Sequence, residues 1–321
     1  MEKFSRQQFQ DKYKSIVPPN VMENLLSKFQ HKLIDLNLPL EMALDIEQIY
    51  IPLYYEDLAN KHETGKPKII GICGSQGSGK TTFTELFKTT LEKGFGLKVV
   101  SVSIDDFYLT QSERIELSKT IHPLLKTRGV PGTHDVSMGL DIFLKLMQFN
   151  SEQEVHIPRF NKAIDDRFPQ KYWNVIREQP DAILFEGWCV GAKPQSADDL
   201  ASPVNQLEVE FDSDGTFRNY VNHKLSTSYQ QWFSMIDSLI LLRVPSFEKI
   251  LEWRYLQEEK LRKLHPQGNS DTNKIMSKAE IEFFVSHFER LTKHMLQSMP
   301  QQADYIIDID EDHSMETIWI H

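Results

Sequence analysis

The segment GICGSQGSGKTTF, residues 71–83, constrains this chain more than any other feature of its sequence. Residues 68–72 before it are short, mostly apolar and rich in β-branched side chains, as in a buried strand of a parallel sheet. Residues 82–91 after it carry apolar side chains at three- and four-residue steps, a pattern typical of a helix. The glycine-rich segment is therefore predicted to be the turn from a buried strand into a helix.

Within this turn, residues 74–81 match the pattern G-x-x-x-x-G-K-[ST] without a gap. Successive backbone N–H groups at a helix N-terminus bind anions, and the helix dipole adds to the attraction. In this pattern the lysine reaches the β- and γ-phosphates of a nucleotide, and the hydroxyl of the last residue ligates Mg²⁺. An ordinary glycine-rich turn is the alternative, which the flanking strand and helix disfavour. The residues expected to bind the nucleotide are Gly74, Ser75, Gln76, Gly77, Ser78, Gly79, Lys80, Thr81 and Thr82.

Strand-like and helix-like segments alternate from residue 68 onward. This alternation favours βαβ units, and therefore a parallel sheet with helices on both faces. We expect an α/β fold of the three-layered P-loop NTPase type over residues 67–321, with a mostly parallel five-stranded sheet. Residues 1–66 are predicted to form an N-terminal helical extension, because apolar residues recur there at helical spacing. The five predicted strands span residues 68–73, 98–104, 181–185, 238–244 and 304–309.

Composition and charge argue against some classes of binding partner, namely nucleic acids and membranes. The 321 residues carry a formal net charge of −10, which argues against a general nucleic-acid binder, because such proteins need a basic face. No apolar run is long enough to span a bilayer, and the first residues lack the apolar core of a signal peptide. Cys73 and Cys189 lie in or beside predicted strands, which predicts buried, reduced thiols. We expect a cytoplasmic protein without nucleic-acid or membrane partners, and the oligomeric state is not predicted.

Acidic residues follow two of the predicted strands, at the edge where parallel α/β sheets bind their ligands. Asp105 and Asp106 come directly after the second strand, and Glu186 with Gly187 follows the third. A lone carboxylate after an apolar strand is costly to bury unless it meets a cation, and Mg²⁺ beside Thr81 is the evident one. The alternative interpretation of the two aspartates is that they form a cap or a turn. The alternative interpretation of Glu186 is a purely structural role.

Two basic segments lie between these acidic residues. Residues 126–135, KTRGVPGTHD, place Arg128 and His134 in a loop rich in turn-forming residues. Residues 157–167, IPRFNKAIDDR, add further cations. Arginine can bind a carboxylate or phosphate through two parallel hydrogen bonds, which lysine cannot. We interpret these segments as a pocket for an anionic small-molecule substrate, with a solvated charged surface as the alternative.

The helical segment near residues 246–263 is predicted to form a lid. Kinases of small molecules close such a lid over ATP and bring an arginine onto the transferring phosphoryl group. Arg254 and Arg262 are the candidates here. Glu252, Glu258 and Glu259 in the same segment leave surface salt bridges as the alternative role for these arginines.

Five segments together carry a family resemblance: GICGSQGSGKTTF, VSIDDFYLT, LLKTRGVPGTHD, IPRFNKAIDDR and LFEGWCVGAKP. They resemble the plant-type D-glycerate 3-kinases and their microbial relatives, within the phosphoribulokinase, uridine kinase and pantothenate kinase group of P-loop kinases. The resemblance covers roughly residues 68–309. The phosphate loop is shared by very many proteins, whereas the combination of DDFYLT with RGVPGTHD is much narrower.

The resemblance implies a role for each matching position. Asp105 is expected to act as the base toward the substrate hydroxyl, while Glu186 and Gly187 lie at Mg²⁺ and the γ-phosphate. The expected metal site consists of Thr81, Glu186 and Asp105. Asn161 departs from the family pattern, in which Asp is common, and the acidic lid leaves the choice between Arg254 and Arg262 open. The implied substrate-binding residues are Asp106, Tyr108, Arg128, His134, Asp135, Arg159, Lys162 and Arg167.

These features predict an ATP- and Mg²⁺-dependent kinase of a small hydroxy acid, and the resemblance implies D-glycerate. Lys80, Asp105 and Glu186 are the expected catalytic residues, together with Arg254 or Arg262. One alternative is the same chemistry on pantothenate, a nucleoside or a sugar phosphate. A second is an ATPase or nucleotide switch, which would need neither a carboxylate base nor an acceptor pocket.

Overall fold

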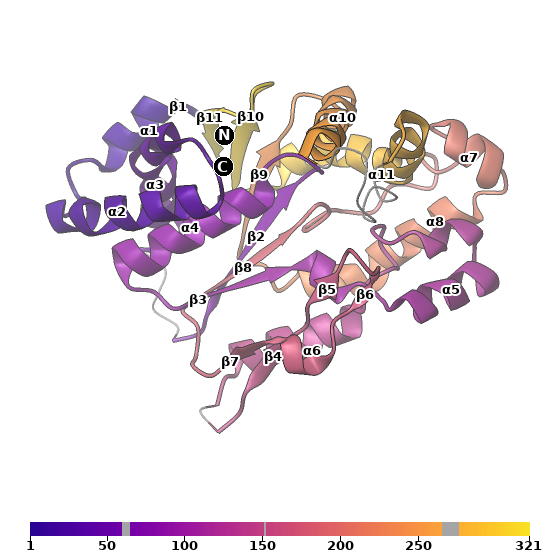
Figure 1. Ribbon diagram of the computed structural model, residues 1–321, viewed down its shortest axis with the longest axis horizontal. Coiled ribbons are helices and arrows are strands. Elements are labelled where there is room, and N and C mark those ends of the chain that lie inside the picture. Colours follow the sequence, from indigo (N-terminus) through magenta and orange to yellow (C-terminus); the bar gives the residue numbers. More distant parts are fainter. Residues whose placement is uncertain (60–64, 151, 265–275) are drawn as a thin grey trace.

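The computed structural model describes residues 1–59, 65–150, 152–264 and 276–321. Its centre is a seven-stranded sheet with the order β1–β11–β10–β9–β2–β8–β3 (Figure 1). The five strands from β10 to β3 run parallel to one another, and they coincide with the five strands that the sequence predicts. These five are β2 (Lys68–Gly74), β3 (Val99–Ser103), β8 (Ala182–Gly187), β9 (Ser238–Arg243) and β10 (Tyr305–Ile309).

Two further strands extend the sheet beyond the predicted five. β11 (Met315–Ile320) returns antiparallel to β10, and β1 (Glu2–Ser5) pairs antiparallel with β11 at the edge. The prediction missed both because β1 has a single apolar residue, Phe4, and β11 belongs to a hairpin outside the βαβ alternation. Residues 1–66 are therefore not only helical, since their first strand belongs to the main sheet.

Each strand divides its side chains between two helical layers, because successive residues point to opposite faces. Ile70 and Ile72 of β2 face a core shared with the N-terminal helices, whereas Ile69 and Cys73 face the opposite core. The first layer contains α1 (Arg6–Tyr13), α2 (Pro19–Asp35), α3 (Ile51–Leu53) and α4 (Lys80–Phe95). The second contains α6 (Val136–Met147), α8 (Thr216–Lys224), α9 (Gln230–Phe233) and α11 (Lys278–Ser298).

The N-terminal extension packs directly on the helix that follows the phosphate loop. The Tyr50 ring lies 5.2 Å from that of Phe83 and 6.1 Å from that of Phe87, measured between centroids. Residues 40–59, which belong to the predicted helical extension, form a 3₁₀ turn and two π-helical turns around α3. These turns are η1 (Leu40–Leu44), η2 (Ile46–Tyr50) and η3 (Tyr54–Leu58).

The remaining elements surround the carboxyl ends of the strands or connect the layers. The 3₁₀ turn η5 (Ile104–Phe107) directly follows β3, and Figure 1 shows the small hairpin β5–β6 beside it. No helix within the described ranges is long and apolar enough to cross a membrane. The connecting elements are α5 (Gln111–Thr120), η6 (Pro123–Lys126), β4 (Val155–Ile157), β5 (Phe160–Asn161), β6 (Asp166–Arg167), η7 (Gln170–Tyr172), β7 (Asn174–Ile176), α7 (Gln206–Phe211), η8 (Leu225–Tyr229) and η10 (Met299–Gln301).

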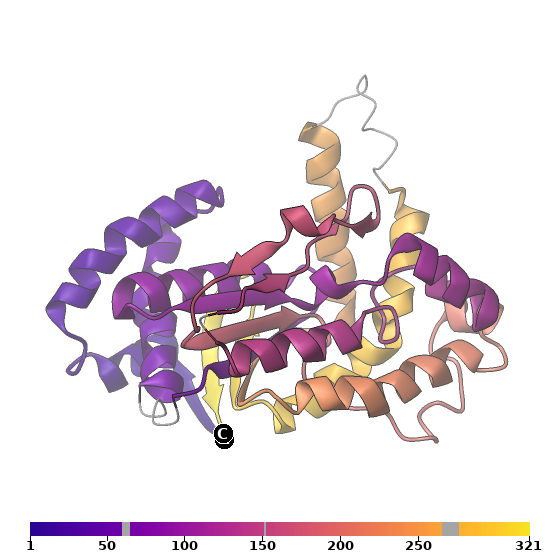
Figure 2. The same cartoon turned by 90° about the horizontal axis from the view of Figure 1, so that it is seen from below.

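The predicted lid segment forms α10 (Phe247–Leu264), whose far end rises away from the sheet in Figure 2. Near its beginning, α10 packs against the phosphate loop, since a Cβ atom built on Gly77 would lie 3.4 Å from the Cβ of Trp253. Arg254 of α10 forms an ion pair with Glu258 one turn further along the helix. The side chain of Arg262 lies outside the described part of the structure.

Candidate active site

The phosphate loop joins β2 to α4 with the geometry that its glycines permit. Gly77 and Gly79 have φ angles of 81° and 82°, in the left-handed region that side chains disfavour. A Cβ on Gly74 would come within 2.5 Å of the Ser78 hydroxyl oxygen and 3.2 Å of the Leu242 Cβ, so a side chain at this position would crowd the loop. The hydroxyls of Ser75 and Ser78 are buried and have no hydrogen-bond partner among the described residues. Because buried polar groups are nearly always satisfied, a phosphate fits this loop.

Glu186 is the penultimate residue of β8, which lies between the strand that leads into the phosphate loop and the strand that leads to Asp105. In the sheet register it is the partner of Ile72 in β2 and of Ser103 in β3. It is 4% exposed, and one carboxylate oxygen lies 3.4 Å from the Thr81 hydroxyl. Burial raises the pKa of Glu186, and the positive charge of Lys80 opposes that rise.

The Thr81 and Glu186 side chains fit a magnesium ion. The second carboxylate oxygen of Glu186 is buried and has no hydrogen-bond partner within the described ranges. Mg²⁺ prefers oxygen ligands and typically binds one or two carboxylates together with substrate phosphates. The described residues contain no group of three or more His, Cys, Asp or Glu side chains that could enclose a metal by themselves. The arrangement therefore suits a metal that arrives with a nucleotide.

Gly187, directly after this carboxylate, allows the strand end to pack closely. A Cβ at this position would lie 2.4 Å from the Cγ2 of Ile104, which is too close for any side chain. Ile104 begins η5, the turn that carries Asp105 and Asp106. Gly187 thus brings the two acidic segments together, and the role at the γ-phosphate that the resemblance implies for it stays a prediction.

Asp105 is held by two partners. One carboxylate oxygen lies 2.6 Å from the ammonium nitrogen of Lys162, and the other accepts a 2.7 Å hydrogen bond from the Tyr108 hydroxyl. Burial alone would raise the pKa of Asp105, but the charges of Lys162 and Lys80 outweigh it and lower the pKa to about 2. The carboxylate is therefore ionised at every physiological pH.

The neighbouring Asp106 has a different environment. One of its carboxylate oxygens accepts a 3.0 Å hydrogen bond from the backbone N–H of Phe160 in β5. Burial raises the pKa of Asp106 to about 6, against the opposing effect of that hydrogen bond. The two adjacent aspartates thus differ, since Asp105 faces the cations while Asp106 anchors the β5–β6 hairpin.

The β5–β6 hairpin places predicted substrate-binding residues over η5. Lys162 lies in its turn, and Arg167 lies in its second strand. Arg167 donates a 2.9 Å hydrogen bond to the carbonyl of Tyr108 and lies 3.6 Å from a carboxylate oxygen of Asp135. The structure therefore brings Lys162, Arg167, Tyr108 and Asp135 together with Asp105.

Arg128 reaches the same region through a residue that the sequence did not single out. It forms an ion pair with Asp165 in the hairpin turn, and its guanidinium lies 5.5 Å from the Phe160 ring. Asp165 also binds the buried Arg114 at 2.9 Å, and Arg114 donates to the carbonyls of Leu109 and Lys126. No sequence signal marked Arg114, because it lies in a helix with little amphipathic pattern.

His134 is buried beside Tyr108, with the two rings stacked at 4.7 Å. Its Nδ1 lies 2.6 Å from the hydroxyl of Tyr229, which itself accepts the backbone N–H of Gly132. Burial lowers the pKa of His134 to about 4, so the imidazole is neutral at pH 7 and adds no charge for an anion. Tyr229 is a supporting residue that lies far along the chain, and the sequence did not indicate it.

Arg159 does not join this cluster. It is exposed, and its guanidinium lies 5.5 Å from the Phe168 ring, where it contacts none of the predicted catalytic groups. Arg254 is paired within its own helix. Among the predicted cations that the structure describes, Lys80 and Lys162 are those whose charges act on Asp105 most directly.

Known proteins resemble this chain over the region that contains the site. The model of the phosphoribulokinase / uridine kinase family matches residues 69–192, which contain the phosphate loop, both aspartates and Glu186. The uncharacterized kinase mug58 of Schizosaccharomyces pombe is 34% identical over 249 residues, which cover 75% of this chain and 82% of the relative.

Two further relatives carry a more specific description. The chloroplastic D-glycerate 3-kinase of Arabidopsis thaliana is 30% identical over 311 residues, 88% of this chain but only 63% of the plant protein. The solved structure of D-glycerate 3-kinase from Cryptococcus neoformans matches with a TM-score of 0.66 at 23% identity, over 85% of this chain and 95% of that one. At this identity the structural match establishes the fold. From the family model and the fission-yeast relative together, the chain belongs to the phosphoribulokinase and uridine kinase family of P-loop kinases.

Proposed function

We propose that this kinase transfers the γ-phosphoryl group of ATP to a hydroxyl group of D-glycerate, with Mg²⁺ as cofactor. The observation that carries the proposal is the ion pair between Lys162 and Asp105 beside the phosphate loop. A hydroxy acid supplies both groups that this pair requires, because its carboxylate can bind Lys162 while its hydroxyl binds Asp105. A neutral acceptor would leave the displaced lysine without a counter-charge.

The phosphate end of the site would hold the nucleotide. Lys80 and the N–H groups of the loop neutralise the phosphates, and Thr81 and Glu186 would hold Mg²⁺, with Asp105 as a further carboxylate nearby. When bound, Mg²⁺ offsets the charge that develops on the phosphate oxygens. The charge of Lys80 already acts on this part of the site, since it helps to lower the pKa of Asp105 and opposes the rise that burial causes in the pKa of Glu186.

Asp105 would orient the acceptor hydroxyl and take its proton. Beside Lys162 its pKa of about 2 makes it a weak base. When the carboxylate of the acceptor draws Lys162 away, the carboxylate of Asp105 loses its strongest partner and becomes more basic. The base is thus strengthened only when an acidic acceptor is present, which disfavours the transfer of the phosphoryl group to water.

Three further assignments belong to this proposal. Arg167 and Arg128 lie in the cluster and would assist Lys162 with the acceptor carboxylate. A lid arginine, Arg254 or Arg262, would approach the transferring phosphoryl group when α10 closes, which requires Arg254 to leave Glu258. Cys73 and Cys189 are both buried free thiols, which fits a reducing compartment such as the cytoplasm.

A panel of small acceptors tests the proposal by release of ADP and by identification of the phosphorylated product. D-glycerate should be phosphorylated, and glycerol, which lacks the carboxylate, should be a poor substrate. Pantothenate, uridine and a sugar phosphate complete the panel, and Lys80→Ala should abolish turnover with every acceptor. Phosphorylation of uridine or pantothenate without that of D-glycerate would contradict the acceptor assignment. ATP hydrolysis that no acceptor stimulates would instead support a nucleotide switch.

A further inference from the structure

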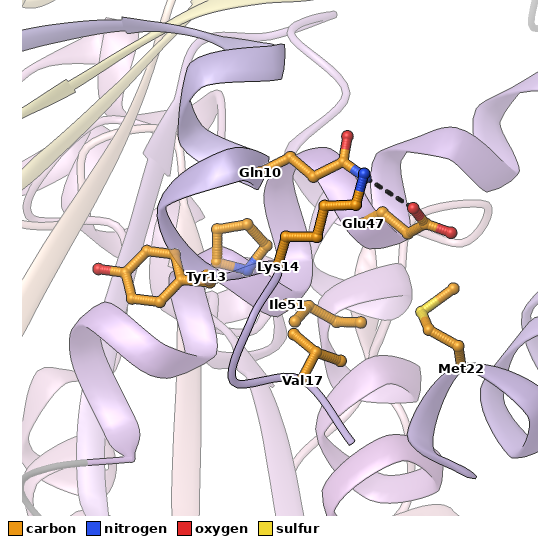
Figure 3. Close-up of a pocket in the computed structure, with 8 residues that line it drawn as sticks. Gln10, Tyr13, Lys14, Val17, Met22, Glu47 and Ile51 are labelled. Atoms are coloured by element: carbon orange, nitrogen blue, oxygen red, sulfur yellow. Dashed lines mark hydrogen bonds between the residues drawn. The ribbon is translucent and has the colours of Figure 1, made fainter. Parts of the chain in front are cut away.

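A pocket outside the kinase site lies within the N-terminal extension (Figure 3). It has a volume of about 200 Å³ and lies between α1, the beginning of α2, and the segment formed by η2 and α3. None of the residues that line this pocket belongs to the phosphate loop or the acceptor cluster. The pocket is lined by Gln10, Tyr13, Lys14, Val17, Met22, Glu47, Ile51 and Pro52.

One part of this pocket is apolar. Ile51 and Pro52 are buried, and Val17 and Met22 are half-buried. A dry cavity of about 150 Å³ lined by aliphatic and aromatic side chains is large enough for benzene. The apolar part can therefore accept a branched aliphatic or aromatic group of similar size.

The rim of the pocket carries two opposite charges. Lys14 and Glu47 are both exposed, and Figure 3 shows their side chains on one side of the pocket with Val17 on the other. Glu47 accepts a 2.7 Å hydrogen bond from the amide of Gln10. Lys14 has no ion pair among the described residues, including Glu47. The rim can thus bind an anionic and a cationic group at the same time.

The wall that carries Glu47 has an unusual backbone. Ile46–Tyr50 is a π-helical turn, and a second π-helical turn, Tyr54–Leu58, follows three residues later. Single π-helical turns are rare and are found frequently at functional sites. This observation is independent of the pocket itself, and it also points to a binding role for this wall.

The segment that forms one wall of the pocket also packs against the helix that follows the phosphate loop. Tyr50 precedes Ile51 of the pocket, and its ring packs against Phe83 and Phe87 of α4. Lys80, which would bind the phosphates, is the first residue of that same helix. A ligand that orders the pocket wall therefore acts on the helix that positions Lys80.

We propose that this pocket binds a free amino acid with an aliphatic side chain, and that its binding changes the affinity for ATP. The side chain occupies the apolar part, the α-carboxylate binds Lys14, and the α-ammonium binds Glu47. Charge complementarity selects a zwitterion, because a simple acid or a simple amine would satisfy only one of the two groups. The binding step does not depend on the proposed acceptor.

Calorimetric titration of the full chain, without ATP or acceptor, tests the binding step. L-leucine should bind, whereas 4-methylpentanoate, 3-methylbutylamine and glycine, which each lack one of the three groups, should bind at least about tenfold more weakly. Lys14→Met and Glu47→Gln should each weaken L-leucine binding by about tenfold. Lys28→Met, an exposed lysine on α2, is the matched control and should leave binding unchanged.

Each other outcome overturns a part of the proposal. The absence of L-leucine binding at millimolar concentration overturns the site, and equal binding of 4-methylpentanoate overturns the zwitterion. Binding that survives both Lys14→Met and Glu47→Gln places the ligand elsewhere. If L-leucine binds but leaves the affinity for ATP unchanged, the link through Tyr50 is wrong. Titration of ATP into wild type and Lys14→Met, with and without L-leucine, measures that link.

Discussion

The two ends of the same parallel sheet differ in whether their buried polar groups have hydrogen-bond partners within the described part of the protein. At the amino ends of the strands, Asp57 is 1% exposed and binds Lys68 at 2.6 Å, the Ser238 hydroxyl at 2.9 Å and the Tyr305 hydroxyl at 3.1 Å. At the carboxyl ends, a carboxylate oxygen of Glu186 and the hydroxyls of two loop serines have no partner among the described residues. The first end is satisfied within the protein, whereas the second is the end where we propose that the nucleotide and Mg²⁺ bind.

This difference suggests that the amino ends of the strands contribute mainly to stability and that the carboxyl ends contribute mainly to function. Asp57 lies in the N-terminal extension, while its three partners begin β2, β9 and β10, so the network fastens the extension to the sheet. The carboxyl ends instead keep charged groups at an energetic cost, as the raised pKa of Asp106 shows. Substitutions at the two ends should therefore affect different measurements.

The largest effect is expected at Asp105. Asp105→Asn preserves shape but removes the base, so kcat should fall by about 10²–10⁴-fold while the midpoint of thermal unfolding changes little. Steady-state kinetics with saturating ATP and D-glycerate measure it. Asp106→Asn is the matched control, with a smaller loss expected. If Asp106→Asn is the crippled variant and Asp105→Asn is not, the two roles are reversed.

At the opposite end, Asp57→Ala should reduce the free energy of unfolding by about 3–5 kcal/mol, because it leaves the buried hydroxyls of Ser238 and Tyr305 without the acceptor that they share and removes the carboxylate from the ion pair with Lys68. The folded fraction should keep the wild-type KM for ATP. Urea unfolding followed by circular dichroism measures the loss, with the exposed Asp11→Ala as a control that should change stability by less than about 0.5 kcal/mol. A stable but inactive Asp57→Ala variant would contradict the division between the two ends.

The pH dependence of stability sharpens the comparison at Asp106. Its folded pKa of about 6 lies above the ordinary value of 3.8, so the folded state binds the proton more tightly and this group's contribution to stability falls as pH rises from about 4 to 6. Asp106→Asn removes that cost and should stabilise the protein at pH 7 by up to about 3 kcal/mol, with no gain near pH 4. Unfolding of both proteins at the two pH values measures the difference. A gain that is equal at both values would show that ionisation is not its cause.

The smallest effect concerns the acceptor. Arg167→Ala should raise the KM for D-glycerate by about ten- to a hundredfold, since a hydrogen bond to a charged group contributes roughly 1.5–3 kcal/mol. The KM for ATP should barely change. Arg159→Ala is the control, because Arg159 lies outside the cluster. A larger effect at Arg159 than at Arg167 would indicate that the hairpin rearranges when substrate binds.

Sequence patterns were sufficient to predict those parts of the structure that depend on residues close together along the chain. The five parallel strands follow from apolar runs that alternate with helical periodicity, and the phosphate loop follows from glycines at fixed spacing before a helix. Because ligand sites in such sheets lie at the carboxyl ends of the strands, the placement of Asp105 and Glu186 beside Lys80 could also be predicted. These inferences need only local geometry and the handedness of βαβ units.

Only the tertiary structure decided which groups pair. Lys162 reaches Asp105 across 57 positions, Tyr229 supports His134 across 95, and Asp57 binds Tyr305 across 248. It also showed that β1 and β11 extend the sheet. Such pairings arise because folding brings distant side chains within a few ångströms, where hydrogen bonds and charges act, and no periodicity along the chain records that proximity. The sequence by itself therefore determined the five parallel strands and the phosphate loop, and the fold determined how the charges around them are balanced.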